Sequence, residues 1–379
     1  MKISVIVPCY NAGNKIIKCL DSIKRQNIST DEYEVIIADD CSSDNSKEII
    51  KGYIKNLRNW HLIELPVNSG SPSKPRNKAL EISRGQYLFY LDCDDELLDG
   101  ALSDYYEHAI GTDADILRGY LLLNDGTKKI EVNKIKNYSE YNSKKDRIKG
   151  ILSSQSTTVC QLIKRDILIK NGIQWPEDIR VGEDTVFLIR VLLKCDNIEY
   201  IDHPTFIYNK IEANGGSTHS YGERELNNHL KVWRFAISNL KEIGVDYISM
   251  RLKIGIQTAL TSFIKYYSKD LSENTFTKFK QFIIEHKVAI ENFKFNSRLT
   301  ELVQIIINSD MDNFLDAIKP RLLIAGYDLK FIKSSVPYLS TIYNIKIDEW
   351  SGHNSHIPGV GGDGVNLGTR SLCIVYIIP

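Results

Sequence analysis

Three carboxylates follow directly on a short apolar run in the N-terminal half of the chain. Residues 87–91 (YLFYL) have the pattern of a strand buried on both faces, and Asp92, Asp94 and Asp95 come at its end. Ligands of open α/β sheets bind outside the carboxyl ends of the strands. Hard oxygen ligands there suit Mg²⁺ or Mn²⁺ holding a phosphate, because buried carboxylates are costly unless a cation or water compensates them. A solvated acidic loop is the alternative for an isolated motif of this kind.

Two earlier predicted strands, 3–7 and 34–38, also end in polar residues. Tyr10 follows the first strand and could offer its ring to a nucleotide base, a stack worth about 1–3 kcal/mol, or pack over a loop. Asp40 follows the second strand and could accept a hydrogen bond from the N3–H group of uracil. Alternatively, Asp40 caps the next helix, a place for which the neighbouring Ser and Asp residues compete.

Two basic and two acidic residues complete the set of candidates. Lys74 and Arg76 could clamp a diphosphate or an anionic acceptor, and Arg is the better bidentate binder; a solvated basic loop is the alternative. Glu183 and Asp184 begin an apolar helical stretch, where the helix dipole alone favours acidic residues. If the pair is catalytic, one carboxylate takes a proton from an acceptor hydroxyl.

Predicted strands and helices alternate along the part of the chain that positions these residues. This alternation predicts right-handed βαβ units and a parallel sheet. The strands are expected at 3–7, 34–38, 60–65 and 87–91, and the helices at 14–26, 45–57 and 76–84. Asn-Asp-Gly within 114–133 predicts a hairpin, and 184–195 has a helical pattern. We therefore expect an α/β fold with a Rossmann-like mixed, mostly parallel sheet.

The C-terminal part of the chain has different patterns. Residues 224–317 are helical in pattern, with aromatic residues at core positions. From residue 321 a strand, a helix and a second strand resemble an incomplete second Rossmann-like βαβ unit, followed by a Gly-rich tail. We expect a first domain at 1–222, a helical accessory or oligomerisation segment at 223–318, and the incomplete unit and tail at 319–379.

Composition excludes some classes of function. Lys+Arg and Asp+Glu both number 48, so the formal net charge is zero, which argues against nucleic acid as a partner. The seven cysteines form no CxxC pair, a usage that suits reduced thiols in the cytosol. We expect no signal peptide, because Pro8 breaks the N-terminal apolar run early. We also expect no membrane span, because no stretch of about twenty uncharged apolar residues occurs.

Taken together and in order, these motifs resemble the family 2 glycosyltransferases with the GT-A fold. The resemblance covers about residues 1–220. A run similar to NSGSPSKPRN (68–77) occurs in bacterial wall teichoic acid and capsule glycosyltransferases. The other matching segments are VIVPCYN (5–11), ADDCSSD (38–44), LDCDD (91–95) and GEDTVF (182–187).

The resemblance implies a UDP-sugar donor and a divalent cation, Mn²⁺ or Mg²⁺. Asp94 is implied to bind the cation that bridges the diphosphate, and Asp95 to be a second ligand or to hold the loop. His219 could also touch the metal or diphosphate, although a lone His is more often structural. The implied donor-binding residues are Pro8, Tyr10, Asn11, Asp40, Asn68, Arg76 and Asp92.

The resemblance also implies a catalytic base and an acceptor site. The second residue of the Glu-Asp motif, Asp184, is implied to be the base, while Glu183 orients or binds the acceptor. Lys74 and Arg76 are candidates for contacts with an anionic acceptor. Direct displacement would invert the configuration at the anomeric carbon.

We therefore expect a metal-dependent, inverting glycosyltransferase that acts in the cytoplasm on a cell-surface glycopolymer or glycan precursor. Peripheral association with the inner face of the membrane and a homo-oligomer fit such a role. One alternative is a catalytically silent nucleotide-sugar-binding scaffold, or the accessory half of a larger polymerase. A nucleotidyltransferase is a second alternative, although PCYNAGNK (8–15) is a poor phosphate loop.

Overall fold

The computed structural model describes residues 1–154, 161–209, 221–266, 270–319, 323–327 and 372–375. Contacts between residues divide the chain into two compact units. The first contains 1–217 and 227–253, and the second contains 218–226 and 254–379. This division assigns 227–253 to the same unit as the sheet, whereas we expected a boundary at 222/223. The division into three segments stays a prediction.

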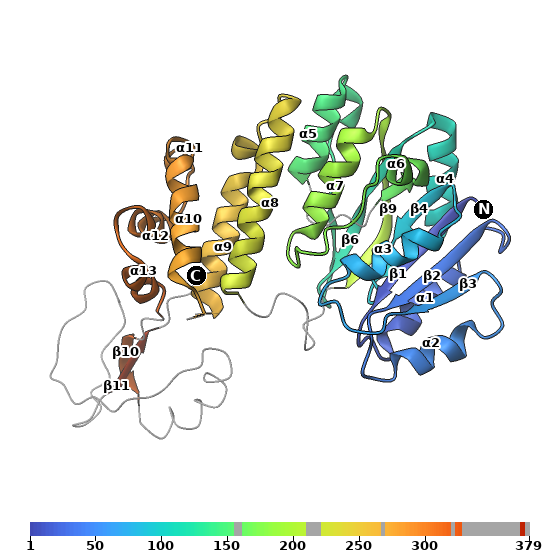
Figure 1. Ribbon diagram of the computed structural model, residues 1–379, viewed down its shortest axis with the longest axis horizontal. Coiled ribbons are helices and arrows are strands. Elements are labelled where there is room, and N and C mark those ends of the chain that lie inside the picture. Colours follow the sequence, from blue (N-terminus) through green and yellow to red (C-terminus); the bar gives the residue numbers. More distant parts are fainter. Residues whose placement is uncertain (155–160, 210–220, 267–269, 320–322, 328–371, 376–379) are drawn as a thin grey trace. The chain divides into compact units, whose positions relative to one another are not determined.

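Parallel strands form one half of the sheet in the first unit, in the order β3-β2-β1-β4 (Figure 1). Every residue of β1, β2 and β4 is buried, as expected for strands covered on both faces. These strands are β1 (Ile3–Cys9), β2 (Tyr33–Asp39), β3 (Trp60–Glu64) and β4 (Tyr87–Tyr90). The connecting helices are α1 (Lys15–Lys24), α2 (Ser46–Ile54) and α3 (Ser73–Ile82), and α3 packs on β1 and β2.

The other half of the sheet is mixed. β8 joins the two halves, since it pairs antiparallel with both β4 and β6, and β9 runs parallel to β6. The expected hairpin is confirmed, because β6 and β7 pair antiparallel. These strands are β5 (Glu96–Leu97), β6 (Ile116–Asn124), β7 (Lys129–Val132), β8 (Gln161–Lys164) and β9 (Ile198–Asn209). The expectation of a mixed α/β sheet is confirmed.

Sequence patterns did not predict β9. The end of this strand, at Asn209, reaches the acidic loop. Pro204 lies within this strand. Proline argues against a strand, because it has no N–H to donate to the hydrogen bonds between strands. In the structure Pro204 pairs with Tyr120 at a place where the register between β6 and β9 shifts. The irregularity accommodates the missing donor, as bulges do elsewhere.

Further helices of the first unit surround the sheet. They are α4 (Ala101–Thr112), η1 (Tyr138–Glu140), α5 (Lys144–Ser154), α6 (Arg165–Lys170), α7 (Glu183–Lys194), the part of α8 (Glu223–Glu242) from Asn227 on, and η2 (Ile248–Leu252). α8 contacts the beginning of α7 through a small cluster formed by Ile179, Val186, Val232 and Phe235. Within the described residues, no helix is both long and apolar enough to cross a bilayer.

The described residues of the second unit up to residue 318 are mostly helical. Its aromatic core includes Phe263, Phe276 and Phe314, whose ring centroids lie 5.5–5.6 Å apart in two pairs. The helices are α9 (Lys253–Tyr266), α10 (Glu273–Glu285), α11 (Lys287–Glu291), α12 (Ser297–Asn308) and α13 (Met311–Ile318). The helical pattern predicted for this region is therefore confirmed.

Beyond the helices, two short strands are described. β10 (Leu323–Tyr327) pairs antiparallel with β11 (Leu372–Val375) in a separate sheet. The first strand of the expected βαβ unit is therefore present. Its helix and second strand, at about 335–350, lie outside the described residues.

A buried polar network fixes the start of β4. The carboxylate of Glu34 accepts hydrogen bonds from Ser4 Oγ (2.7 Å), from the Arg84 backbone N–H (2.6 Å) and from the Arg84 side chain (2.8 Å). The Gly85 N–H donates to Ser4 Oγ (2.8 Å). Burial raises the pKa of Glu34, but these hydrogen bonds outweigh it, and the net pKa is lowered.

Close packing at Gly85 yields a stability prediction. A Cβ at this position would lie 2.3 Å from the Ser4 backbone nitrogen, so Gly85→Ala must displace β1 or β4 and should lower the free energy of unfolding by about 1–3 kcal/mol or more. Gly52→Ala is the matched control, because its Cβ meets nothing within 4 Å in α2 and should stabilise the helix by up to about 1 kcal/mol. Urea unfolding measures both; equal values for the two variants would contradict the packing argument.

Candidate active site

The predicted polar clusters meet at the carboxyl ends of β1, β2 and β4. The Asp40 N–H donates to the carbonyl of Cys9 (2.8 Å), and the Leu91 N–H donates to the carbonyl of Ile6 (3.0 Å). Because β1 pairs in parallel with both β2 and β4, the residues that follow each strand lie at one edge of the sheet. The structure therefore brings together the segments at 8–11, 39–44 and 91–95.

Asn11 ties the first two of these segments together. Its backbone is left-handed (φ 48°), a conformation that Asn tolerates better than most residues. Its N–H donates to Ser42 Oγ (2.9 Å), and its side-chain oxygen accepts from the Ser43 N–H (2.8 Å). Next to it, the Tyr10 side chain is 50% exposed, so its ring is available to a ligand. Pro8 is buried within β1.

Asp40 holds the loop at 68–70. It is 3% exposed, and both of its carboxylate oxygens accept from the Ser69 N–H (3.0 Å each), while Ser69 Oγ donates to Oδ2 (2.9 Å). Asn68 Nδ2 donates to the Asp40 carbonyl (3.1 Å). Asp40 is not a helix cap, because α2 begins after Asn45. The segment predicted to hold uracil is thus rigidly built.

Asp95 and Asp94 occupy different environments in the acidic loop. Asp95 is buried, and its Oδ1 accepts from the Asn209 N–H at the end of β9 (3.0 Å). Asn209 Nδ2 also donates to the Asp94 carbonyl (3.1 Å). The Asp94 side chain is exposed. Asn209 therefore anchors the loop and leaves the Asp94 carboxylate free to meet a ligand.

The acidic loop concentrates negative charge that raises the pKa values of its carboxylates. Burial, followed by repulsion from Asp92 and Asp94, raises the pKa of Asp95, and desolvation followed by repulsion from Asp92 raises that of Asp94. Asp95 Oδ2 is buried without a hydrogen-bond partner among the described residues. Asp94 and Asp95 thus fit a divalent cation. No set of three or more His, Cys, Asp or Glu in the described part of the chain could hold a metal alone, so a ligand would have to complete the shell.

Arg76 is a buried charge between two groups of carboxylates. Its side chain, on α3, is 3% exposed. Nη2 donates to Asp92 Oδ1 (2.6 Å), and Nη1 lies 3.9 Å from Glu183 Oε1. Asp92 precedes the candidate metal residues, whereas Glu183 begins α7. The arginine therefore links the acidic loop with the Glu-Asp motif and is not a surface charge. Lys74, two residues earlier, is partly buried.

Gly182 allows the Glu-Asp motif to begin α7 at this place. Its backbone is left-handed (φ 85°), and a Cβ there would approach Val232 Cγ2 of α8 at 3.0 Å. Asp184 Oδ1 accepts from the Thr185 N–H (2.6 Å). Both carboxylates are partly exposed, as expected for groups at a site.

Burial and mutual repulsion make the two carboxylates of the motif unequal. Burial, then the charge of Asp184, raises the pKa of Glu183 to about 8, against the opposing effect of Arg76. Burial also raises the pKa of Asp184, but the hydrogen bond from the Thr185 N–H opposes this. A pKa of about 8 keeps Glu183 largely protonated at neutral pH. Two neighbouring acids in different environments can divide the roles of acid and base.

Two residues of the site were missed by sequence reasoning. Asn209 lies at the end of the unpredicted strand β9, so its position could not be inferred. Trp175 precedes α7 by several residues and lies over Arg76, with 4.1 Å between the guanidinium carbon and the ring centroid. Its closeness in sequence to the Glu-Asp motif was the one signal that could have indicated that Trp175 lies at the site. His219 lies outside the described residues.

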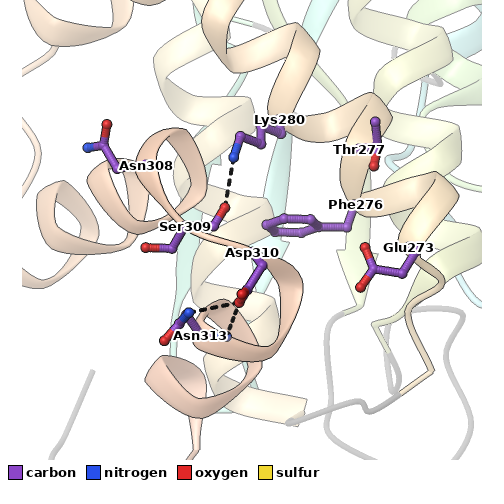
Figure 2. A pocket seen from close by; sticks show the side chains of 8 residues that line it. All are labelled: Glu273, Phe276, Thr277, Lys280, Asn308, Ser309, Asp310 and Asn313. Carbon is purple, nitrogen blue, oxygen red and sulfur yellow. Dashed lines mark hydrogen bonds between the residues drawn. The ribbon is translucent and has the colours of Figure 1, made fainter.

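A polar pocket in the second unit contains none of the predicted site residues (Figure 2). Lys280 Nζ donates to the Ser309 carbonyl (2.8 Å), and Asp310 Oδ1 accepts from the N–H (2.9 Å) and Nδ2 (2.8 Å) of Asn313. Asp310 is the N-cap of α13. These polar groups therefore serve to end one helix and begin the next.

Comparisons with known proteins show a family match for the N-terminal part of the chain. Residues 4–172 match the model of "Glycosyl transferase family 2". The chain is 36% identical over 202 residues to "Poly(ribitol-phosphate) beta-glucosyltransferase" of Bacillus spizizenii, which covers 52% of this chain and 30% of that protein. It is 32% identical over 198 residues to "Poly(ribitol-phosphate) beta-N-acetylglucosaminyltransferase TarP" of Staphylococcus aureus, covering 52% of this chain and 59% of that protein. The chain thus spans less than two thirds of either relative.

A solved structure supports the fold. The crystal structure of S. aureus TarS 1-349 superposes with a TM-score of 0.62 at 22% sequence identity, and the match covers 84% of this chain and 90% of that one. The matched structure includes the helical region as well as the sheet, since the strands end at residue 209 in the first unit. The expected GT-A fold is confirmed. Residues 4–172, which hold the strand-end clusters of the site, match the family model of glycosyl transferase family 2.

Proposed function

We propose that this chain transfers a sugar from a UDP-sugar to a hydroxyl group of a cell-surface glycopolymer of the teichoic acid or capsule type. The observation that carries the proposal is the buried Arg76, which joins the acidic loop at Asp92 to the Glu-Asp motif at Glu183. A donor bound at the acidic loop and an acceptor bound at the Glu-Asp motif would then lie on either side of the Arg76 guanidinium. Relatives named as poly(ribitol-phosphate) glycosyltransferases support this polymer class.

The donor side is formed by the strand ends. The exposed ring of Tyr10 would stack on the uracil base, and Asp40, fixed by Ser69, would read its N3–H group. Solved complexes of S. aureus TarS 1-349 with UDP and with UDP-GlcNAc support a uridine nucleotide. Asn11 and Asn68 would hold the loops around the nucleotide, and Asp92 would face the ribose.

Asp94 and Asp95 would hold a divalent cation, Mn²⁺ or Mg²⁺. The cation would supply Lewis-acid stabilisation of the negative charge on the departing UDP. The raised pKa values of these carboxylates support this assignment, because they mark an uncompensated concentration of negative charge. The diphosphate would complete the ligand shell.

Asp184 would act as the base. The acceptor hydroxyl oxygen attacks the anomeric carbon, the bond from that carbon to the UDP oxygen breaks, and the hydroxyl proton passes to the Asp184 carboxylate. One displacement of this kind inverts the anomeric configuration. Glu183, which keeps its proton at neutral pH, would donate a hydrogen bond that orients the acceptor, and Lys74 would contact an anionic acceptor. A cytosolic location, peripheral membrane association and self-association stay predictions.

A panel of UDP-sugars tests the proposed function. We expect UDP release in the presence of Mn²⁺ with at least one donor, and faster release when a poly(ribitol-phosphate) acceptor is added. Product analysis by NMR should show inversion at the anomeric carbon. UDP binding without release from any donor, with acceptor present, would instead indicate a silent binding scaffold, and pyrophosphate release from a nucleoside triphosphate would indicate a nucleotidyltransferase.

Asp94→Asn tests the cation site. Because Asp94 would bind the cation, its loss should lower the rate of UDP release about 100-fold or more and weaken UDP binding in Mn²⁺, measured by calorimetry. Asp99→Asn is the matched control, since Asp99 is an exposed acid just beyond β5 that pairs with Arg25 (3.3 Å). An equal rate for Asp94→Asn and wild type, also in EDTA, would rule out this metal role.

Asp184→Asn and Glu183→Gln test the division of roles. Loss of the base should lower kcat about 100-fold or more with donor affinity kept. Glu183→Gln resembles the protonated wild-type side chain and should cost much less at pH 7. In wild type, kcat should fall as pH rises through about 8, because Glu183 loses its proton; this fall should be absent in Glu183→Gln. Equal losses in the two variants would contradict the assignment.

The same ionisation has a consequence that does not depend on activity. Since the pKa of Glu183 is about 8 in the folded chain and 4.5 is its ordinary value, the folded state binds the proton more tightly than the unfolded state. This group should therefore make the free energy of unfolding fall as pH rises between these two values. Denaturation at several pH values should show a smaller fall in Glu183→Gln.

A further inference from the structure

Arg76 has few hydrogen bonds for a buried guanidinium. Asp92 accepts from Nη2 (2.6 Å), but Nε and Nη1 are buried without a hydrogen-bond partner among the described residues. Nη1 is 3.9 Å from Glu183 Oε1, which is an ion-pair distance without a hydrogen bond. One hydrogen bond leaves the plane of the guanidinium free to turn about it. Another contact must therefore set that plane.

The ring of Trp175 provides this contact. The guanidinium carbon of Arg76 lies 4.1 Å from its centroid, and the Phe187 ring stacks on it at 4.0 Å with 9° between the planes. The Arg76 guanidinium and the Phe187 ring, each about 4 Å from the Trp175 ring, cannot share one face of it. Trp175 therefore lies between them. Tyr90 closes the stack edge-on, at 5.1 Å from Trp175 and 5.7 Å from Phe187.

The backbone of Trp175 is fixed by the neighbour of Arg76 in the sequence. Asn77 Oδ1 accepts from the Trp175 N–H (2.8 Å), and Asn77 Nδ2 donates to the Trp175 carbonyl (3.0 Å). Two consecutive residues of α3 thus hold the tryptophan, one at its backbone and one at its ring. Phe187 follows Glu183 by four residues on α7 and lies on the same helical face. The stack therefore connects α3 to the helix that carries the Glu-Asp motif.

We propose that Trp175 is a positioning residue of the transfer reaction. Its ring sets the plane of the Arg76 guanidinium. The guanidinium in turn fixes the position of Asp92, on the donor side, relative to Glu183, on the acceptor side. This inference rests on the proposed function. An aromatic face attracts a cation most strongly where both are desolvated, as they are here. Displacement of a reacting group by about 1 Å can cost about 100-fold in rate.

Trp175→Leu tests the inference, because leucine keeps the site apolar but has no ring face. We expect kcat to fall about tenfold or more, whereas Trp175→Phe should keep most of it. Adding Trp175→Leu to Arg76→Gln should lower kcat less than about twofold further, because the tryptophan acts through the arginine. Equal effects in the two backgrounds would overturn the inference, as would a normal kcat in Trp175→Leu.

Trp60→Leu is the matched control. Trp60 is also buried in the first unit (4% exposed), and its ring contacts Tyr53 at 5.8 Å in a tilted arrangement, not a site residue. This variant should lose stability but keep kcat well below its melting temperature. Where Trp175→Leu does not fold, Trp175→Met replaces it, since the flexible thioether chain fills the space without a ring, and the same outcomes decide.

The pH dependence of kcat gives a second test. A purely structural role of Trp175 would leave this pH dependence unchanged. The charged groups that face Glu183 are Asp184 on α7, Arg76 on α3 and Asp92 in the acidic loop. A guanidinium that has turned away stabilises the ionised Glu183 less. The alkaline fall of kcat should therefore move to higher pH in Trp175→Leu and not in Trp60→Leu; an unmoved fall would overturn the inference.

NMR of the arginine side chains separates this inference from the proposed function. In the free protein, the ring current of Trp175 should displace the Arg76 Nε–H signal, which Arg76→Gln identifies by its loss. The displacement should disappear in Trp175→Leu and persist in Trp60→Leu. If no UDP-sugar is turned over but this signature is present, the proposed function fails while the positioning contact stands. Turnover with an undisplaced Arg76 signal would overturn the inference alone.

Discussion

The buried ion pair between Arg76 and Asp92 is the interaction on which the site depends. A charge removed from water is costly unless a partner with good geometry compensates it, and Arg76 is 3% exposed. Its guanidinium therefore needs Asp92 at 2.6 Å, whereas the carboxyl group of Glu183 lies at 3.9 Å. Asp92 and Glu183 are far apart in the sequence, so folding must bring the end of β4 and the beginning of α7 to the same arginine.

Negative charge nevertheless exceeds positive charge around Arg76. Burial and repulsion raise the pKa values of Asp94, Asp95, Glu183 and Asp184 together. A diphosphate would add more negative charge to the same region, and the proposed cation would compensate both. The electrostatics that raise these pKa values are therefore compatible with the proposed cation and nucleotide donor. Shifted pKa values of this kind are common among titratable groups at functional sites.

Sequence patterns predicted the parallel half of the fold well, because strands buried on both faces appear as continuous apolar runs that are easy to recognise. They also placed the clusters at Tyr10, Asp40 and Asp94 on one sheet edge, which follows from parallel pairing. β9 was missed because Pro204 opposes a strand locally and a shift in register accommodates it. The contact of Trp175 with Arg76 joins residues about 100 positions apart, and no local periodicity encodes it.

The division of the site into a donor side and an acceptor side, joined by Arg76, is the central claim. A crystal structure of this chain with UDP and Mn²⁺ tests it most directly. We expect uracil against Tyr10 beside Asp40, the cation on Asp94, and the Arg76–Asp92 pair intact, with Asp184 open to an acceptor. UDP bound away from the ends of β1, β2 and β4, or a cation held without Asp94, would contradict it.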